Sequence, residues 1–158
     1  MIAPIFFVLI FAIIQLGIVF GAQNALVNGV RDAARRAATY RINEETYSDT
    51  ALWVTICQSI EQRLRESVAT YPATDAFSTR LKPTIAYEWE QSMSSGDWFL
   101  VAHVSATYDN ELYVPLISSV LDAADANPTD GNLTLSATEQ MRIENPALAP
   151  PATNPPAC

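Results

Sequence analysis

The feature that most constrains this chain is an unbroken apolar run, Ile2 to Phe20, in which Gln15 is the only strongly polar residue. A helix of roughly 20 residues crosses the hydrocarbon core of a bilayer. The run is apolar on every face, and the rest of the 158-residue chain is too small to bury it. It therefore indicates a transmembrane helix rather than the core helix of a soluble domain.

A cleaved signal peptide is the other class of segment with such a run. No basic region precedes the run, no convincing cleavage site follows it, and helical patterning continues through Tyr40. Pro4 falls in the first turn, where a missing N–H costs little. We expect one helix to about Arg41, roughly 55 to 60 Å long, of which a bilayer holds about half. Residues 1–42 are thus predicted to form a transmembrane or filament-core helix, and residues 43–158 a globular domain.

Small residues recur at every fourth position along this predicted helix. A ridge of Gly and Ala lets two helix backbones approach closely. Alanine is also simply a good helix former, but glycine costs about 1 kcal/mol in a helix interior, so the glycines favour close packing. Asp32, beside the ridge, has Arg35 and Arg36 as candidate ion-pair partners on the same helix. The predicted helix-packing residues are Gly17, Gly21, Ala25, Gly29, Ala33 and Ala37.

The remaining sequence predicts an α+β domain, in which a second helix packs on an antiparallel sheet of about three strands. The helix is expected from Ser48 or Asp49, either of which can cap it, to Thr70. Its predicted apolar stripe consists of Leu52, Ile56, Ile60, Leu64 and Val68.

Two alternating segments flank a turn at 94–97 and indicate a hairpin. They are Thr84–Glu90 and Trp98–Tyr108, and the second has one face made of Leu100, Ala102, Val104 and Ala106 beside Trp98. A third strand is predicted over Asn132–Arg142. Residues 111–121 indicate a loop that enters a short amphipathic helix or turn, and residues 127–131 indicate a turn.

Composition argues against several classes of function. The net charge is −8, from 9 basic and 17 acidic residues, so the domain repels nucleic acid. Glu88 and Glu90 share one face of a strand, where a solvated surface is far commoner than an acid/base pair. His103, the sole histidine, has no Ser/Asp or Cys/His partners near it in sequence, so it is interpreted as a sheet-surface residue. No catalytic, cofactor or metal site is predicted, and the chain is not expected to be an enzyme.

The two cysteines, Cys57 and Cys158, lie far apart and cannot complete a usual zinc site with one histidine. In an oxidising compartment they can form one disulfide; in a cytosolic protein they are two unrelated thiols. The last segment, residues 145–158, is rich in proline and is expected to be extended. A free tail is one interpretation of it. A tail tied back through Cys158 is the other.

Several segments together resemble the TadE-like pseudopilins, minor subunits of the tight-adherence (Flp/Tad) type IV pilus. A proline opens the apolar run, and an Ala/Arg-rich helix follows it. The N-terminal segments that carry the resemblance are Pro4-Ile-Phe-Phe-Val-Leu-Ile-Phe-Ala-Ile-Ile-Gln15-Leu-Gly17, Ala22-Gln-Asn-Ala25-Leu-Val-Asn28 and Arg31-Asp-Ala-Ala-Arg-Arg-Ala-Ala38. A weaker echo lies in Leu133-Thr-Leu-Ser-Ala-Thr138 and Arg142-Ile-Glu-Asn-Pro146.

The sequence departs from the family at two points. Members carry a basic leader that a prepilin peptidase removes, and a glutamate close to the new N-terminus; neither is seen here. Gln15 stands where the family has an acidic residue late in the apolar run. We expect a basic leader to precede residue 1; the alternative is a divergent member that is not processed. Without such a leader, the arginines that follow the run would place the domain in the cytoplasm.

The resemblance implies a structural subunit, a pilin or minor pseudopilin, with a role in pilus assembly and surface adhesion. The implied partners are other pilin or pseudopilin subunits, met through the N-terminal helix, and the inner membrane before assembly. The implied location is the bacterial inner membrane with an extracytoplasmic domain, or an extracellular pilus. The alternative is a single-span, membrane-anchored extracytoplasmic binding domain that enters no filament.

Overall fold

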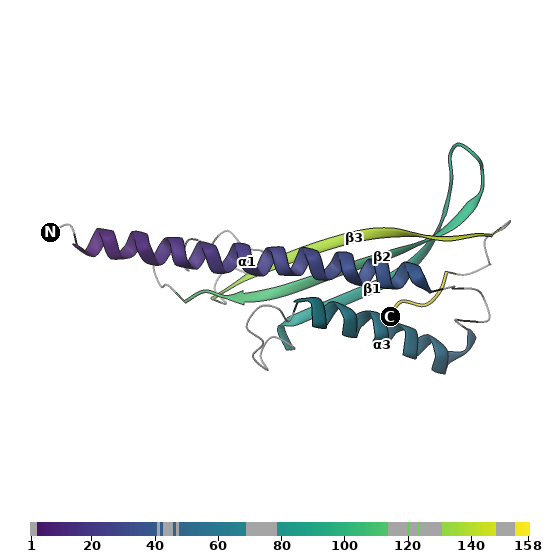
Figure 1. Cartoon of the computed structure of the whole chain (residues 1–158), viewed down its shortest axis with the longest axis horizontal. Coiled ribbons are helices and arrows are strands. Elements are labelled where there is room, and N and C mark those ends of the chain that lie inside the picture. Colours follow the sequence, from purple (N-terminus) through teal and green to yellow (C-terminus); the bar gives the residue numbers. More distant parts are fainter. Residues whose placement is uncertain are drawn as a thin grey trace.

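The computed structural model (Figure 1) describes residues 3–40, 42, 46, 48–68, 79–113, 120, 123, 131–147 and 154–158, without the side chains of residues 3, 4 and 144–147. Its main elements are the helices α1 (Ala3–Thr39) and α3 (Thr50–Val68) and the strands β1 (Leu81–Gln91), β2 (Trp98–Glu111) and β3 (Asn132–Ala147). The strands form one antiparallel sheet in the order β1-β2-β3. The predicted α+β architecture is confirmed.

The α3 helix begins at the predicted cap. The Asp49 carboxylate accepts hydrogen bonds from the backbone N–H groups of Ala51 and Leu52, at 3.0 and 3.2 Å. These bonds satisfy two of the N–H groups that a helix start leaves without intrahelical partners. Asp49 therefore fixes where α3 begins.

The apolar stripe of α3 is as predicted except at its first position. Leu52 is 46% exposed, whereas Trp53 is buried. A three-residue step from Trp53 to Ile56 keeps the indole on the buried face, and its ring meets that of Tyr87 on β1 at a centroid distance of 5.4 Å. The large aromatic side chain takes the place predicted for Leu52. The other buried residues of α3 are Ile56, Ile60, Leu64 and Val68.

The sheet alternates as the sequence indicates, with one apolar face turned toward the helices. Leu100, Ala102, Val104 and Ala106 of β2 are all buried. The β1–β2 hairpin turns at Gly96, whose φ of 76° favours glycine. β1 extends beyond both of its predicted ends, whereas β2 and β3 begin where predicted and extend only at their C-terminal ends. β3 continues through Pro146, because a proline without an N–H is tolerated on a strand at the edge of a sheet.

The helices cover the apolar face of the sheet in an uneven way. α1 lies along β2 and β3, and α3 lies beside α1 with fewer contacts to β1. The first part of α1 projects past the end of the strands (Figure 1). The core draws on α1, α3 and all three strands, so the C-terminal half of α1 is packed into the domain.

The end of the chain lies along the outer edge of β1. The Cys158 N–H donates to the Ile85 carbonyl at 2.9 Å, and the Trp89 N–H donates to the Asn154 side-chain oxygen at 3.3 Å. A disulfide joins Cys158 to Cys57 on α3. The tail is therefore tied back, and its residues 154–158 shield a strand edge that would otherwise be open to pairing with another chain.

Two of the predicted segments lie largely outside the described residues. One is the short helix or turn within residues 111–121, of which 114–119 and 121 are not described. The other is the turn at 127–131, of which only Gly131 is described. The division into parts 1–42 and 43–158 stays a prediction.

Replacing Gly29 should destabilise the fold. A Cβ at this position would lie 2.3 Å from Val68 Cγ2 and 3.4 Å from the Leu64 carbonyl oxygen. Because a valine side chain is stiff, Gly29→Leu should cost at least about 1–3 kcal/mol, the usual range for overpacking. Thermal unfolding of the full chain in detergent, followed by circular dichroism, measures this loss.

The matched control for this prediction is Gly17→Leu, since no atom of the described chain lies within 4 Å of a Cβ built at Gly17. Its melting temperature should stay within a degree or two of that of the unaltered chain. Equal losses from the two substitutions would contradict the packing seen at Gly29.

Breaking the disulfide should loosen the tail and lower stability. Cys57 and Cys158 are separated by 101 residues, and closing a loop of that size stabilises a domain by about 2–4 kcal/mol. Cys158→Ser should lower the free energy of urea unfolding by this amount and speed hydrogen exchange along β1. Cys57→Ser combined with Cys158→Ser should cost no more than the single change. A single variant as stable as the unaltered chain would refute this account.

Candidate assembly surface on the stem helix

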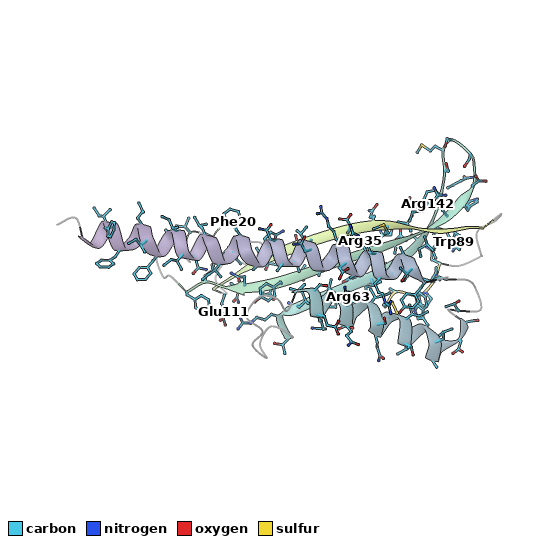
Figure 2. All side chains as sticks on the ribbon, viewed as in Figure 1. Phe20, Arg35, Arg63, Trp89, Glu111 and Arg142 are labelled. Atoms are coloured by element: carbon cyan, nitrogen blue, oxygen red, sulfur yellow. A yellow bond between two sulfur atoms is a disulfide. The ribbon has the colours of Figure 1, made fainter. Side chains whose placement is uncertain are left out.

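The α1 helix divides into two parts according to what surrounds its side chains. From Ala22 onward one face is buried in the domain, and Leu26, Val30 and Ala34 are at most 1% exposed. Before that point the helix, here called the stem (Ile5–Phe20), carries ten large apolar side chains that are at least 40% exposed (Figure 2). These are Ile5, Phe6, Phe7, Val8, Leu9, Phe11, Ile13, Ile14, Leu16 and Phe20.

Within the described residues, α1 is the one helix long and apolar enough to cross a membrane. Within Ile5–Thr39, the most apolar 18-residue window has a mean hydropathy of 2.7. Only 11% of that window is buried within the chain, whereas the core helix of a soluble protein is mostly buried. By its length and composition, the helix is compatible with a membrane anchor.

Gln15 interrupts the apolar surface of the stem and is only 1% exposed. Its side-chain oxygen accepts a hydrogen bond from the Tyr113 backbone N–H, just after β2, at 3.0 Å. Its amide nitrogen has no hydrogen-bond partner among the described residues. A polar side chain that is buried needs a hydrogen-bond partner. The single glutamine within the apolar run was therefore the feature of the sequence that could have indicated a contact between Gln15 and the domain.

The residues around this contact form a small charged network at the end of β2. The Glu111 carboxylate accepts hydrogen bonds from the Arg80 guanidinium and from the Tyr113 hydroxyl, the latter at 3.0 Å. These two hydrogen bonds, that of Arg80 foremost, hold the pKa of Glu111 below its usual value. The network lies at the end of the domain nearest the stem.

The structure places the predicted helix-packing residues in two groups. Gly29, Ala33 and Ala37 are buried within the chain, and Gly29 lies directly against α3. Gly17 is exposed, and Gly21 and Ala25 are half-buried. The C-terminal half of the ridge is thus filled by the chain's own domain, which leaves the N-terminal half for contacts with other helices. Packing between chains stays a prediction.

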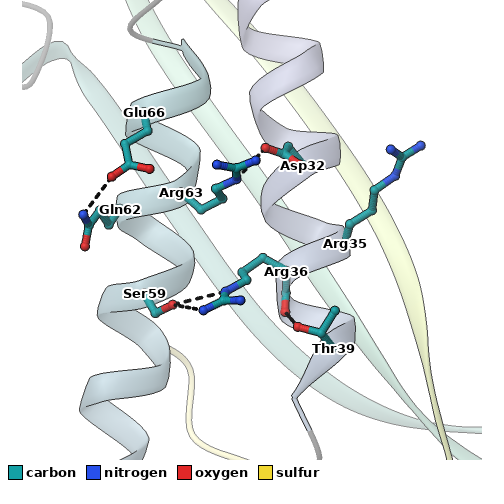
Figure 3. A pocket seen from close by; sticks show the side chains of 8 residues that line it. All are labelled: Asp32, Arg35, Arg36, Thr39, Ser59, Gln62, Arg63 and Glu66. Atoms are coloured by element: carbon teal, nitrogen blue, oxygen red, sulfur yellow. Dashed lines mark hydrogen bonds and ion pairs between the residues drawn. The ribbon is translucent and has the colours of Figure 1, made fainter.

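A polar seam joins α1 to α3 above the buried ridge. The Asp32 carboxylate pairs with Arg63 at 2.7 Å and accepts a hydrogen bond from the Ser67 hydroxyl at 2.7 Å. Arg35 and Arg36, the partners expected for Asp32, do not pair with it. Arg63 and Ser67 approach Asp32 from α3, whereas Arg36 turns toward Ser59 (Figure 3).

A shallow groove runs along this seam. Figure 3 shows its lining, in which Arg35 extends away from α3 while Arg36 reaches across to it. The groove is rich in arginine, unlike the acidic chain as a whole. Its lining residues include Asp32, Arg35, Arg36, Ser59, Gln62 and Arg63.

His103 lies on the outer face of the sheet, where the sequence placed it. Its Nε2 is 3.9 Å from a Glu88 carboxylate oxygen and 3.7 Å from a Glu90 oxygen. In the described ranges no group of three or more His, Cys, Asp or Glu side chains is arranged to hold a metal ion. The surface of α1 is therefore the best-developed candidate site.

The exposed apolar stem and the first part of the small-residue ridge lie in the segment that is similar to a known family. The N-terminal segment is TadE-like. Residues 1–35 match the sequence model of a family described as TadE-like protein, which confirms over this segment the resemblance drawn from its residues. No curated protein and no solved structure matches the chain. The TadE-like segment covers the whole stem and the first part of the buried ridge, and it points to a protein associated with the Tad pilus.

Acid should weaken the network at the end of β2. A carboxylate whose pKa is lowered on folding contributes stability above its unfolded pKa, about 4.3 for glutamate, and that contribution disappears as the pH falls through the lowered value. The melting temperature of the full chain should therefore depend on pH below about pH 4.3. Glu111→Gln should reduce that dependence, and an unchanged dependence would contradict the network.

Proposed function

We propose that this chain is a structural subunit, a pilin or minor pseudopilin, of a Tad/Flp-type pilus, with a role in pilus assembly and surface adhesion. The observation that carries the proposal is the exposed apolar stem lying within the TadE-like segment. The stem packs in the filament core or lies in the inner membrane before assembly. The domain then stands outside the membrane or on the surface of the filament.

The exposed stem supports this proposal because it is unfavourable in water. Fully burying a large apolar side chain contributes about 1.5–3 kcal/mol, and ten such side chains stand at least 40% exposed along the stem. A bilayer or a bundle of similar helices supplies the missing apolar surroundings. The proposed partners are therefore the lipid of the inner membrane before assembly, and other pilin or pseudopilin subunits after it.

The N-terminal half of the ridge supports packing against other helices. Gly17 has no atom of the described chain within 4 Å of the place where a Cβ would stand. Small residues at such positions let the backbone of a neighbouring helix approach closely. We propose that the stem of a neighbouring copy packs against α1 at this open position, here called the notch at Gly17.

A structural role, rather than catalysis, is the function that we propose for the domain. The seam residues Asp32 and Arg63 are joined to each other, and this pair holds two helices together. The alternative is a single-span anchored domain that binds a partner at the cell surface and enters no filament.

Filling the notch should prevent assembly without unfolding the domain. We expect Gly17→Leu to remove the protein from sheared pili while it remains in the membrane fraction, because a leucine holds neighbouring helix backbones apart. Gly17→Ala, which keeps the position small, should assemble normally. Immunoblots of sheared and membrane fractions measure both outcomes.

The same fractions distinguish the two proposed functions. If the unaltered chain is absent from sheared filaments under conditions that produce pili, the anchored-domain alternative is correct. If Gly17→Leu enters filaments as well as Gly17→Ala does, close packing at the notch is refuted.

A further inference from the structure

Most described cations of this acidic chain are paired with acids, and two of the exceptions are neighbours on α1. Five described cations form ion pairs. Arg142 forms none with a described carboxylate and lies over the Phe99 ring on the sheet. Arg35 and Arg36 likewise form none. They are neighbours, both are exposed, and both line the groove between α1 and α3. The paired cations are Arg31, Arg63, Arg65, Arg80 and Lys82.

Arg36 is held in place without being neutralised. Its guanidinium donates to the Ser59 hydroxyl from Nε and Nη2 at 3.4 and 3.3 Å, and it lies 5.1 Å from the centroid of the Tyr40 ring. The Tyr40 hydroxyl is in turn 2.7 Å from Ser59 Oγ. A guanidinium has five N–H donors in a fixed fork, so the contacts with Ser59 orient Arg36 and leave donors free for a carboxylate.

An acidic patch that forms no ion pair with a described arginine or lysine lies on the outer face of the sheet, on the face that also carries His103 and Arg142. Glu88 and Glu90 stand on the outer face of β1, with side chains 59% and 46% exposed. The His103 Nε2 lies 3.9 Å from a Glu88 oxygen and 3.7 Å from a Glu90 oxygen. Neither glutamate forms an ion pair with a described arginine or lysine.

The sheet keeps these two patches apart within one chain. The buried residues Ile85 and Tyr87 alternate with Glu88 and Glu90 along β1, so the glutamates face away from the helices. Arg35 and Arg36 lie on the helical side. The two patches are complementary in charge, and they can meet only between two copies.

We propose that Arg35 and Arg36 of one copy dock on Glu88 and Glu90 of the next copy. The charge complementarity of the two patches argues for a second copy as the occupant. Because each copy offers one patch on each side, the contact is head-to-tail and repeats from copy to copy, as the contacts of an open helical array do. The inference rests on the proposed function, since the stems hold neighbouring copies side by side.

A charge exchange tests this docking. One variant carries Arg35→Glu and Arg36→Glu, and the other carries Glu88→Arg and Glu90→Arg. Full-length copies with donor and acceptor fluorophores are placed in vesicles of neutral phosphatidylcholine, and energy transfer reports association at matched density. Each variant alone should associate about tenfold more weakly than the unaltered chain. An equal mixture of the two should recover to within about twofold, since the two variants then alternate, and one contact between them is native while the other has reversed charge.

The control is Met93→Glu, which shifts the net charge in the same direction as the arginine changes at a fully exposed position in the turn between β1 and β2. It should associate as the unaltered chain does. Circular dichroism spectra of all variants should match, because the exchanged side chains are exposed.

Three results would overturn the inference: a mixture no better than its components, variants that associate normally, or loss only from the arginine changes. In the last case, association that depends on added anionic lipid would identify lipid phosphate as the ligand of the groove. A failed exchange for a chain found in sheared pili refutes only this docking. Absence of the unaltered chain from pili refutes the proposed function instead.

Discussion

The close approach of α1 to α3 at Gly29 is the contact on which the rest of the structure depends. With no side chain at Gly29, Val68 and the Leu64 carbonyl come against the backbone of α1. The same approach brings Asp32 within reach of Arg63 and Ser67. α3 has few contacts with the sheet, so its place in the domain follows mainly from its fit against α1.

This dependence gives one helix two kinds of surroundings. Its C-terminal half is part of a domain core, where Ala33 and Ala37 are fully buried. Its N-terminal half carries apolar side chains that the chain itself does not cover. The change occurs near Gln15 and Ala22, where the domain first touches the helix. An N-terminal deletion of the stem therefore removes little from the core. A deletion that extends past Ala22 also removes residues of α1 that pack against the sheet.

Much of this arrangement could be predicted from the sequence, because it rests on local patterns. The apolar run, the cap at Asp49 and the alternation of β2 are signals carried by neighbouring residues, and they led to the correct elements. The partners of the small ridge could not be predicted in this way. Glycine and alanine permit close packing but do not indicate which helix packs against them. The sequence therefore did not predict that Gly29 would contact Val68 of its own chain. The choice of Arg63 over Arg35 for Asp32 likewise depends on how two helices far apart in sequence are placed.

The disulfide between the tail and α3 determines how a pulling force on α1 is transmitted through the domain. A pull along α1 shears it against β2 and β3, and the Gly29 and Asp32 contacts pass part of that load to α3. From α3 the load reaches the edge of β1 through the covalent link between Cys57 and Cys158 and the hydrogen bond from Cys158 to Ile85. The disulfide thus links the helical layer to the far edge of the sheet. Tension can pass through this link and need not pass through the segment that joins α3 to β1.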